Sequence, residues 1–368
     1  MEAAPGADYN NMIQNKQEKA VGIQPIYKRL WFRIIAFLLA LILVFSIWAN
    51  GAIQLKIHKE NEQDAAAQYL MDNTDYVQSG EMDRLEEKLQ SYSKPTTLED
   101  YYRLAGTQIG AGEYEAALES VDTCLELYSG ENEELYMDLL LKRGCLHVLL
   151  GQYEQAVEAL EQVLLKNPEQ ADAYLVLAQI YSETGNYQGL IPVLGEYLKL
   201  KPEDSDIRAV LAQVLFQAGE FQMAIEEYDR LKMMEGMSES GNQILFLQAL
   251  AYIQLADYTT AKELLLTIVG SEEKIPGADY YLGVCYLSEE DYDSAEPHFT
   301  AALDAGDMVQ LSSYSRAVCR LMKTEFDYEG ALTDLEAAIA YDEADRDPAI
   351  TEQAQGLLDT ILTQNTGR

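Results

Sequence analysis

Basic residues, cysteine and histidine are all scarce in this sequence. Lys and Arg number 26 against 62 Asp and Glu, which leaves a formal net charge of −36. A field of this sign repels phosphate backbones, so the composition argues against a nucleic-acid-binding protein. The four cysteines include no CxxC pair and the three histidines are scattered, so neither a zinc motif nor a redox motif is present.

Motifs of catalytic sites are also lacking. The sequence contains no nucleophile elbow, glycine-rich phosphate loop, EF-hand loop or HExxH string. Acidic runs such as Glu289-Glu290-Asp291 are typical of solvated helix surfaces. We therefore expect no enzymatic activity, no cofactor and no bound metal. A hydrophobic content of 48% excludes a mainly disordered chain.

One uncharged stretch is long enough to cross a membrane. Residues 34–53 read IIAFLLALILVFSIWANGAI, and a helix of this length spans a hydrocarbon layer of about 30 Å. The only two tryptophans, Trp31 and Trp48, would lie about 26 Å apart along that helix, so each ring can reach an interface. The stretch predicts an uncleaved transmembrane helix. A signal peptide cleaved near Ala49 is the alternative.

The flanking charges predict the orientation of this helix. Five Lys and Arg residues precede it, whereas Lys56 and Lys59 behind it lie among acidic residues. The positive-inside rule keeps the tail of residues 1–33 in the cytoplasm and places residues 54–368 outside. Residues 1–53 hold three Asp and Glu and thus a net charge of +2, which leaves −38 for residues 54–368. An anionic lipid surface repels such a region.

Two columns of residues recur through the rest of the chain at intervals of 34 to 39 residues. In one column an aromatic residue stands three places before alanine, and in the other a small residue stands nine places before that aromatic. Two antiparallel helices can pack closely where a small side chain on one meets a small one on the other. Glycine two places before four of the aromatics predicts a turn with positive φ. The aromatic column is Tyr114, Tyr153, Tyr187, Phe221, Tyr258, Tyr292 and Tyr328; the small column is Ala105, Gly144, Ala178, Ala212, Ala249, Gly283 and Cys319.

This pattern resembles the tetratricopeptide repeat family, in segments such as AYLVLAQIYSETGNYQGLIPVLGEYLKLKP and ILFLQALAYIQLADYTTAKELLLTIV. The resemblance covers residues 98–345 as seven repeats and implies an all-α, right-handed α-solenoid. Leu190 departs from the alanine pattern, and Ala256, Glu290 and Phe326 replace the turn glycine in the last three repeats. We expect residues 54–97 to form a stalk and a degenerate repeat. Residues 346–368 should form a capping helix.

The resemblance also implies that the first helix of each repeat lines a concave groove, which binds a protein or peptide. The inward positions begin with Asp172, Leu175 and Gln179 in the third repeat and Gln213 in the fourth. Apolar and aromatic positions follow, and then three cations at i, i+4 and i+7, which could clamp an acidic segment or a C-terminal carboxylate. The alternative is that the aromatics pack between repeats and the cations neutralise neighbouring carboxylates. The candidate partner-binding residues are Phe216, Phe246, Leu250, Ile253, Tyr280, Val284, Leu287, Arg316, Arg320 and Lys323.

Together these features predict a membrane-anchored scaffold or adaptor that mediates protein–protein interaction on the extracytoplasmic side. Two alternatives remain open. One is a chaperone-like or secretion-accessory protein that binds unfolded exported clients. The other is the same scaffold with its repeats facing the cytoplasm.

Overall fold

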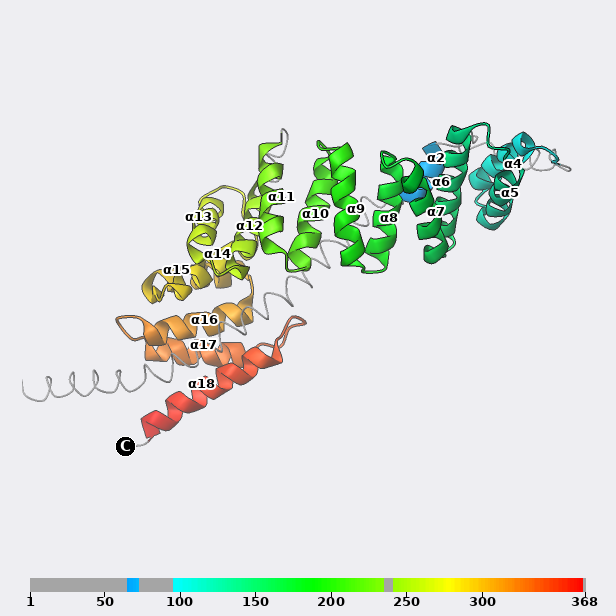
Figure 1. The fold of residues 1–368 in the computed structure, drawn as a ribbon. Helices are drawn as coiled ribbons and strands as arrows, with labels where there is room; N and C mark the ends of the chain where they lie inside the picture. Colours follow the sequence, from blue (N-terminus) through cyan, green and yellow to red (C-terminus); the bar gives the residue numbers. More distant parts are fainter. Residues whose placement is uncertain (1–64, 73–94, 235–240, 367–368) are drawn as a thin grey trace, which may run out of the picture. The chain divides into compact units, whose positions relative to one another are not determined.

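The computed structural model describes residues 65–72, 95–234 and 241–366, and all regular structure in these ranges is helical. The predicted tail of residues 1–33 and the predicted membrane helix of residues 34–53 lie outside them. Among the helices of the described ranges, none combines the length and the apolar character needed to span a bilayer. The helices (Figure 1) are α2 (Ala65–Asp72), α4 (Leu98–Ala111), α5 (Tyr114–Leu127), α6 (Glu133–Leu149), α7 (Tyr153–Lys166), α8 (Ala171–Glu183), α9 (Tyr187–Leu200), α10 (Ser205–Gln217), α11 (Phe221–Met233), α12 (Gly241–Gln254), α13 (Tyr258–Val269), α14 (Ala278–Ser288), α15 (Tyr292–Ala305), α16 (Val309–Met322), α17 (Tyr328–Ala340) and α18 (Pro348–Thr366).

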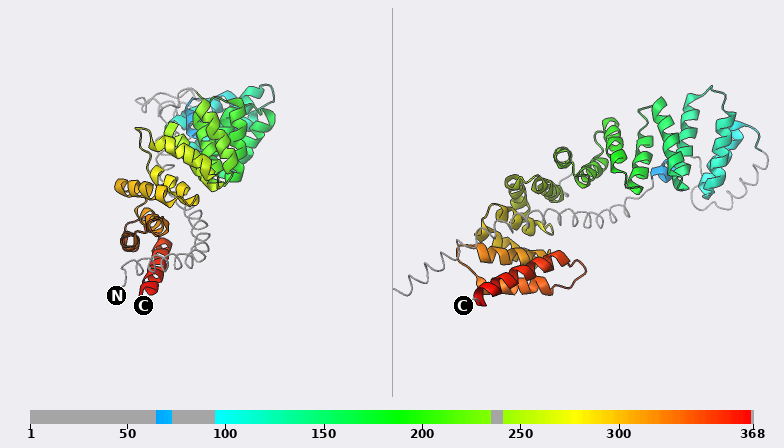
Figure 2. Two further views of the ribbon diagram at one scale, coloured as in Figure 1. Left: turned by 90° about the vertical axis from the view of Figure 1, so that its left-hand side faces the viewer. Right: turned by 60° about the horizontal axis from the view of Figure 1, so that its bottom comes forward.

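From α4 to α17 the helices form consecutive pairs. The two helices of a pair pack on each other, from α4 with α5 to α16 with α17, and the second helix of each pair packs on the first helix of the next. The last helix, α18, packs on α17 and also contacts α16. The right-hand view of Figure 2 shows the pairs following one another in chain order. The described residues therefore form an all-α helical-repeat solenoid, which confirms the predicted fold class at this level.

In the turn inside each of the first four pairs, the glycine has the positive φ that the sequence predicted. In two later pairs the same place is taken by Ala256 and Glu290, with φ of 59° and 61°. A side chain with a Cβ costs about 1–2 kcal/mol in this conformation. Packing of the helix pair therefore imposes the turn even where the local residue disfavours it. The glycines, with φ between 65° and 81°, are Gly112, Gly151, Gly185 and Gly219.

Part of the acidic composition is used at helix starts. Thr97 and Asp100 form a capping box at the beginning of α4. At four other helices an Asp side chain accepts a hydrogen bond from the backbone N–H three residues later. These carboxylates satisfy otherwise unpaired donors and also face the positive end of the helix dipole. The four residues are Asp204, Asp257, Asp291 and Asp327.

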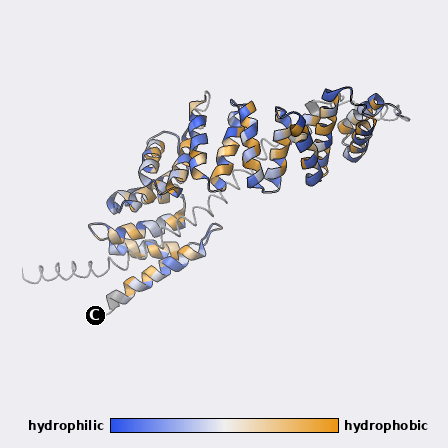
Figure 3. Cartoon of the chain, viewed as in Figure 1, coloured by the Kyte–Doolittle hydropathy of each residue, from blue (hydrophilic) through white to orange (hydrophobic). Residues whose placement is uncertain are grey.

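The predicted column of small residues lies where the two helices of a pair approach most closely. A Cβ on Gly144 would lie 2.9 Å from Cγ of Leu160, and a Cβ on Gly283 would lie 2.8 Å from Cε1 of Phe299. In these two pairs the small residue thus receives a bulky side chain of the second helix, and not the second small residue expected from the sequence. Apolar residues gather between helices and polar residues outside them (Figure 3). Four further members of the column are at most 1% exposed: Ala105, Ala212, Ala249 and Cys319.

Replacing Gly283 with valine should lower the free energy of unfolding by about 1–3 kcal/mol, because the added side chain overlaps the fully buried Phe299 ring. The matched control is Gly195→Ala in α9, where a Cβ has nothing within 4 Å. Alanine in that helix interior should stabilise the chain by about 0.5–1 kcal/mol. Urea unfolding followed by circular dichroism measures both. A Gly283→Val chain as stable as the unmodified one would contradict the close approach of α14 and α15.

Candidate partner-binding surfaces

The seven apolar residues predicted to contact a partner are buried. Their exposed fractions run from 0% for Ile253 to 9% for Phe246. The rings of Phe246 and Tyr281 pack edge to face with centroids 5.7 Å apart, which joins α12 to α14. Such side chains offer a partner little surface, and the alternative that they pack between repeats describes their positions. The set comprises Phe216, Phe246, Leu250, Ile253, Tyr280, Val284 and Leu287.

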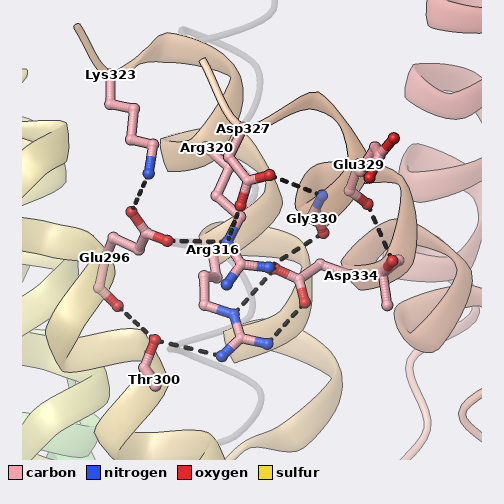
Figure 4. Close-up of polar contacts among 10 residues, drawn as sticks. Glu296, Thr300, Arg316, Arg320, Lys323, Asp327, Glu329, Gly330 and Asp334 are labelled. Carbon is pink, nitrogen blue, oxygen red and sulfur yellow. Dashed lines mark hydrogen bonds and ion pairs between the residues drawn. The ribbon is translucent and has the colours of Figure 1, made fainter. Parts of the chain in front are cut away.

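Arg316 and Arg320 of α16, and Lys323 directly after it, are paired with carboxylates on the neighbouring helices (Figure 4). Arg316 forms a two-pronged bond to Asp334 of α17, with Nε–Oδ2 at 2.9 Å and Nη2–Oδ1 at 2.7 Å. Arg320 donates from Nε to Glu296 of α15 and from Nη1 to Asp334, both at 2.9 Å. Lys323 donates from Nζ to the other oxygen of Glu296 at 2.9 Å. The stripe therefore joins α16 to the helices on both sides.

This ion-pair network is mostly enclosed. The side chains of Arg316, Arg320 and Lys323 are 18–19% exposed, and that of Asp334 is 4% exposed. Burial alone would raise the pKa of Glu296, but the hydrogen bonds from Arg320 and Lys323 outweigh it and lower that pKa. A partner's carboxylate would have to displace Asp334 or Glu296 to reach the cations. Neutralisation within the chain accounts for the stripe, and its role in partner binding stays a prediction.

A different surface carries a polar cluster that the sequence analysis did not select. It is formed by the first helices of the first three pairs, and we name it the α4/α6/α8 face. Lys142 is only 3% exposed and forms an ion pair with Asp138 of the same helix. Its Nζ lies 5.2 Å from the ring centroid of Tyr102, whose hydroxyl donates to Oδ2 of Asp138 at 2.9 Å. An enclosed charge pair is tolerated only where further hydrogen bonds satisfy it.

The short helix α2 lies on the α4/α6/α8 face, in contact with α6 and α8 (Figure 1). The Tyr69 hydroxyl donates to Oδ1 of Asp138 at 3.1 Å, and the backbone N–H of Ala66 donates to Oε1 of Gln179 at 3.2 Å. Ala66, Tyr69 and Leu70 are 0%, 8% and 1% exposed. Burial raises the pKa of Tyr69 and the Asp138 carboxylate raises it further, so the hydroxyl remains a neutral donor. The face thus holds a helical segment through apolar and polar contacts together.

The sequence contained part of the signal for this surface. Gln179 and Asp172 were predicted to point inward, and Asp138 stands at the place of Asp172 one repeat earlier. Asp138 with Lys142 at i+4 is an ion pair on an inward position, which marks a polar site inside a mostly apolar helix. The place of helix α2 on this face carried no signal, because its contacts with α6 and α8 link residues 69 and 113 positions apart.

Cysteine and metal chemistry find little basis in the described residues. All four cysteines there are buried. Burial raises the pKa of Cys124 to about 11 and that of Cys285 to about 12, so both thiols are neutral near pH 7 and are poor nucleophiles. Across residues 65–72, 95–234 and 241–366, no group of three or more His, Cys, Asp or Glu is arranged to hold a metal ion.

The stacked helix pairs define a helical-repeat solenoid, a class of fold typical of scaffolds for protein–protein interaction. Two stretches match family models described as tetratricopeptide repeat, over residues 147–189 and 246–307. The chain therefore contains tetratricopeptide repeats. No curated protein sequence matches it significantly.

Solved structures with similar folds include several tetratricopeptide repeat proteins. A repeat protein from Parabacteroides merdae shares 14% identity over 72% of this chain and 98% of its own, with a TM-score of 0.39. YrrB, described as a TPR protein with an unusual peptide-binding site, shares 18% identity over 49% of this chain and 88% of its own, with a TM-score of 0.38. The MamA protein shares 19% identity over 48% and 97%, with a TM-score of 0.35. Similarities at this level say nothing about the partner of this chain.

Replacing Asp334 with asparagine should lower the free energy of unfolding by about 3 kcal/mol, because two guanidinium groups lose the buried carboxylate that they share. The control is Lys323→Ala, which removes one bond of a cation about a fifth exposed and should cost less than about 1 kcal/mol. Urea unfolding of both chains measures the difference. Equal losses would show that Asp334 is not the centre of the network.

Proposed function

We propose that this chain is a membrane-anchored tetratricopeptide repeat scaffold or adaptor that binds a segment of a partner protein on its first helices, on the extracytoplasmic side. The observation that carries this proposal is the α4/α6/α8 face, which holds the helix α2. The apolar contacts of this face supply affinity. The hydrogen bonds to Asp138 and Gln179 orient the helix that lies on it. Helix-on-face binding is therefore the mode that we infer for a partner.

The membrane part of the proposal is supported by the sequence alone. Residues 34–53 have the length and the flanking tryptophans of a bilayer-spanning helix. The charge of −38 on residues 54–368 favours a region held away from anionic lipid, where it is accessible to other proteins. The excess of Lys and Arg before the span favours repeats outside the cytoplasm.

A chaperone-like function for unfolded exported clients is the less favoured candidate. A surface that accepts many sequences needs adaptable apolar side chains that remain exposed. The apolar candidates from Phe216 to Leu287 are instead buried between helices. Asp138 accepts from a side-chain hydroxyl at a fixed place, which favours a partner that carries one there over many partners.

A photocrosslinking side chain at Gln213, a half-buried inward position of α10, should capture one partner in living cells. The matched control is Met223 of α11, which is 48% exposed but lies on a second helix and should capture none. One discrete product at position 213, identified by mass spectrometry, is the expected result. A ladder of many products would favour the chaperone function, and identical products from both positions would contradict binding on the first helices.

The orientation is tested with one epitope tag before residue 1 and another after residue 368. In right-side-out membrane vesicles, added protease should remove the C-terminal tag and spare the N-terminal one until detergent is added. Replacing Lys28, Arg29 and Arg33 with alanine should weaken this orientation, because the positive charges that retain the tail are lost. A C-terminal tag that resists protease in intact vesicles would place the repeats in the cytoplasm.

A further inference from the structure

The position of α2 breaks the order that the other helices follow. In a solenoid each repeat contacts its neighbours in the chain. Among the described helices, every other substantial contact joins neighbours or next-but-one neighbours in chain order, and α18 ends the series on α17 and α16. α2 precedes α4 in the sequence but lies against α6 and α8. It is therefore placed as a bound segment, not as the first member of the stack.

The contacts of α2 are those of a ligand in a built site. The backbone N–H groups of a helix's first turn have no partner within the helix, and Gln179 accepts one of them from Ala66. Tyr69 completes the cluster of Asp138, Lys142 and Tyr102, since its hydroxyl bonds the carboxylate and its ring centroid lies 6.0 Å from Nζ of Lys142. One helix thus satisfies two polar groups of the face and covers its apolar part.

The side chain of Leu70 adds the apolar component. With Ala66 and Tyr69 it belongs to the hydrophobic cluster that contains Leu139, Leu146 and other core residues of the first repeats. Removing α2 would expose this apolar surface and the enclosed charge pair at the same time. A free α4/α6/α8 face would consequently favour any helix that offers the same three features.

We propose that α2 is a tethered ligand that occupies the α4/α6/α8 face in cis, and that a partner must displace it with a helix of the same pattern. That pattern is a small residue, a tyrosine three places later and then an apolar residue, as in Ala66, Tyr69 and Leu70. This inference rests on the proposed function and adds to it the chemistry of the partner segment and a competition that limits its binding.

The partner helix needs a tyrosine because the Asp138 carboxylate of the face accepts a hydrogen bond from its hydroxyl. A phenylalanine at the same place would leave Asp138 without one of its hydrogen bonds, so the face discriminates in favour of the hydroxyl. Helix α2 competes with the helix of a partner because α2 is covalently attached to the chain. Such attachment gives a segment an effective concentration that can reach about the millimolar range. A partner's apparent affinity then falls in proportion to the fraction of chains whose face is free.

The test uses the full chain in detergent and a fluorescein-labelled peptide of residues 63–72, QDAAAQYLMD, read by anisotropy. A chain with Tyr69→Ala should bind this peptide at least about tenfold more tightly than the unmodified chain, a difference of about 1.4 kcal/mol. A peptide carrying Tyr69→Phe should bind the same chain about fivefold more weakly. Adding Asp138→Asn to the chain should weaken binding of the original peptide. It should also reduce the chain's preference for the peptide with tyrosine over the peptide with phenylalanine.

The matched control chain is Tyr187→Ala, which removes a tyrosine of α9 that is 42% exposed, and it should bind the peptide as the unmodified chain does. Absence of peptide binding by a helical Tyr69→Ala chain would overturn the proposal and make α2 a fixed part of the core. If that variant loses helicity, hydrogen exchange of the unmodified chain decides whether α2 is a displaceable ligand or a fixed part of the core. Amides of α2 must exchange faster than those of α6 and α8, and protection equal to theirs overturns the proposal.

These outcomes are separate from those of the proposed function. Crosslinking from Gln213 reports a partner on α10, which α2 does not substantially contact. If that product forms while the peptide fails to bind, the scaffold function stands and only the tethered ligand is wrong. If the peptide binds and no crosslink forms, the face is a helix site, but the proposed partner binding on the first helices beyond it is wrong.

Discussion

Close packing of two helices over a small side chain is the constraint on which the rest of this chain depends. Gly144 and Gly283 leave room for Leu160 and Phe299, and the other members of the column are small and mostly fully buried. A larger residue would separate the helices and leave voids around them, because protein interiors tolerate little free volume. The constraint also extends to the turns. Ala256 and Glu290 adopt positive φ because the helices that they join are already held together.

Several of the few cations in this acidic chain form ion pairs that hold neighbouring helices together. Arg208 bonds Glu227 at 2.7 Å with both side chains about nine-tenths buried, and Arg316 and Arg320 share Asp334. In such places an ion pair is stabilising only when both partners are well hydrogen-bonded, and losing one partner leaves an enclosed charge. Other carboxylates, such as Asp204 and Asp291, cap helices, and the acidic excess of the chain repels phosphate and anionic lipid. Composition therefore restricts the class of partner while the interior pairs preserve the stack.

The polar groups of the α4/α6/α8 face connect this architecture to binding. In the first helix α6, Asp138 and Lys142 form an ion pair on the side that α2 covers. An enclosed pair of this kind requires further donors, and the hydroxyls of Tyr102 and Tyr69 each bond one oxygen of Asp138. The same requirement makes the face selective, because a helix without a hydroxyl at that place leaves the carboxylate less satisfied.

The sequence by itself determined the helical period, the seven aromatic and small positions and the turn glycines, since each depends on residues close together in the chain. It did not determine which inward residues stay exposed. Phe246, Tyr280 and Arg316 occupy positions expected to face a partner, yet side chains from neighbouring helices enclose them. Only the tertiary structure could place α2 on α6 and α8, because hydrogen bonds between residues 69 and 113 positions apart leave no periodic trace in the sequence.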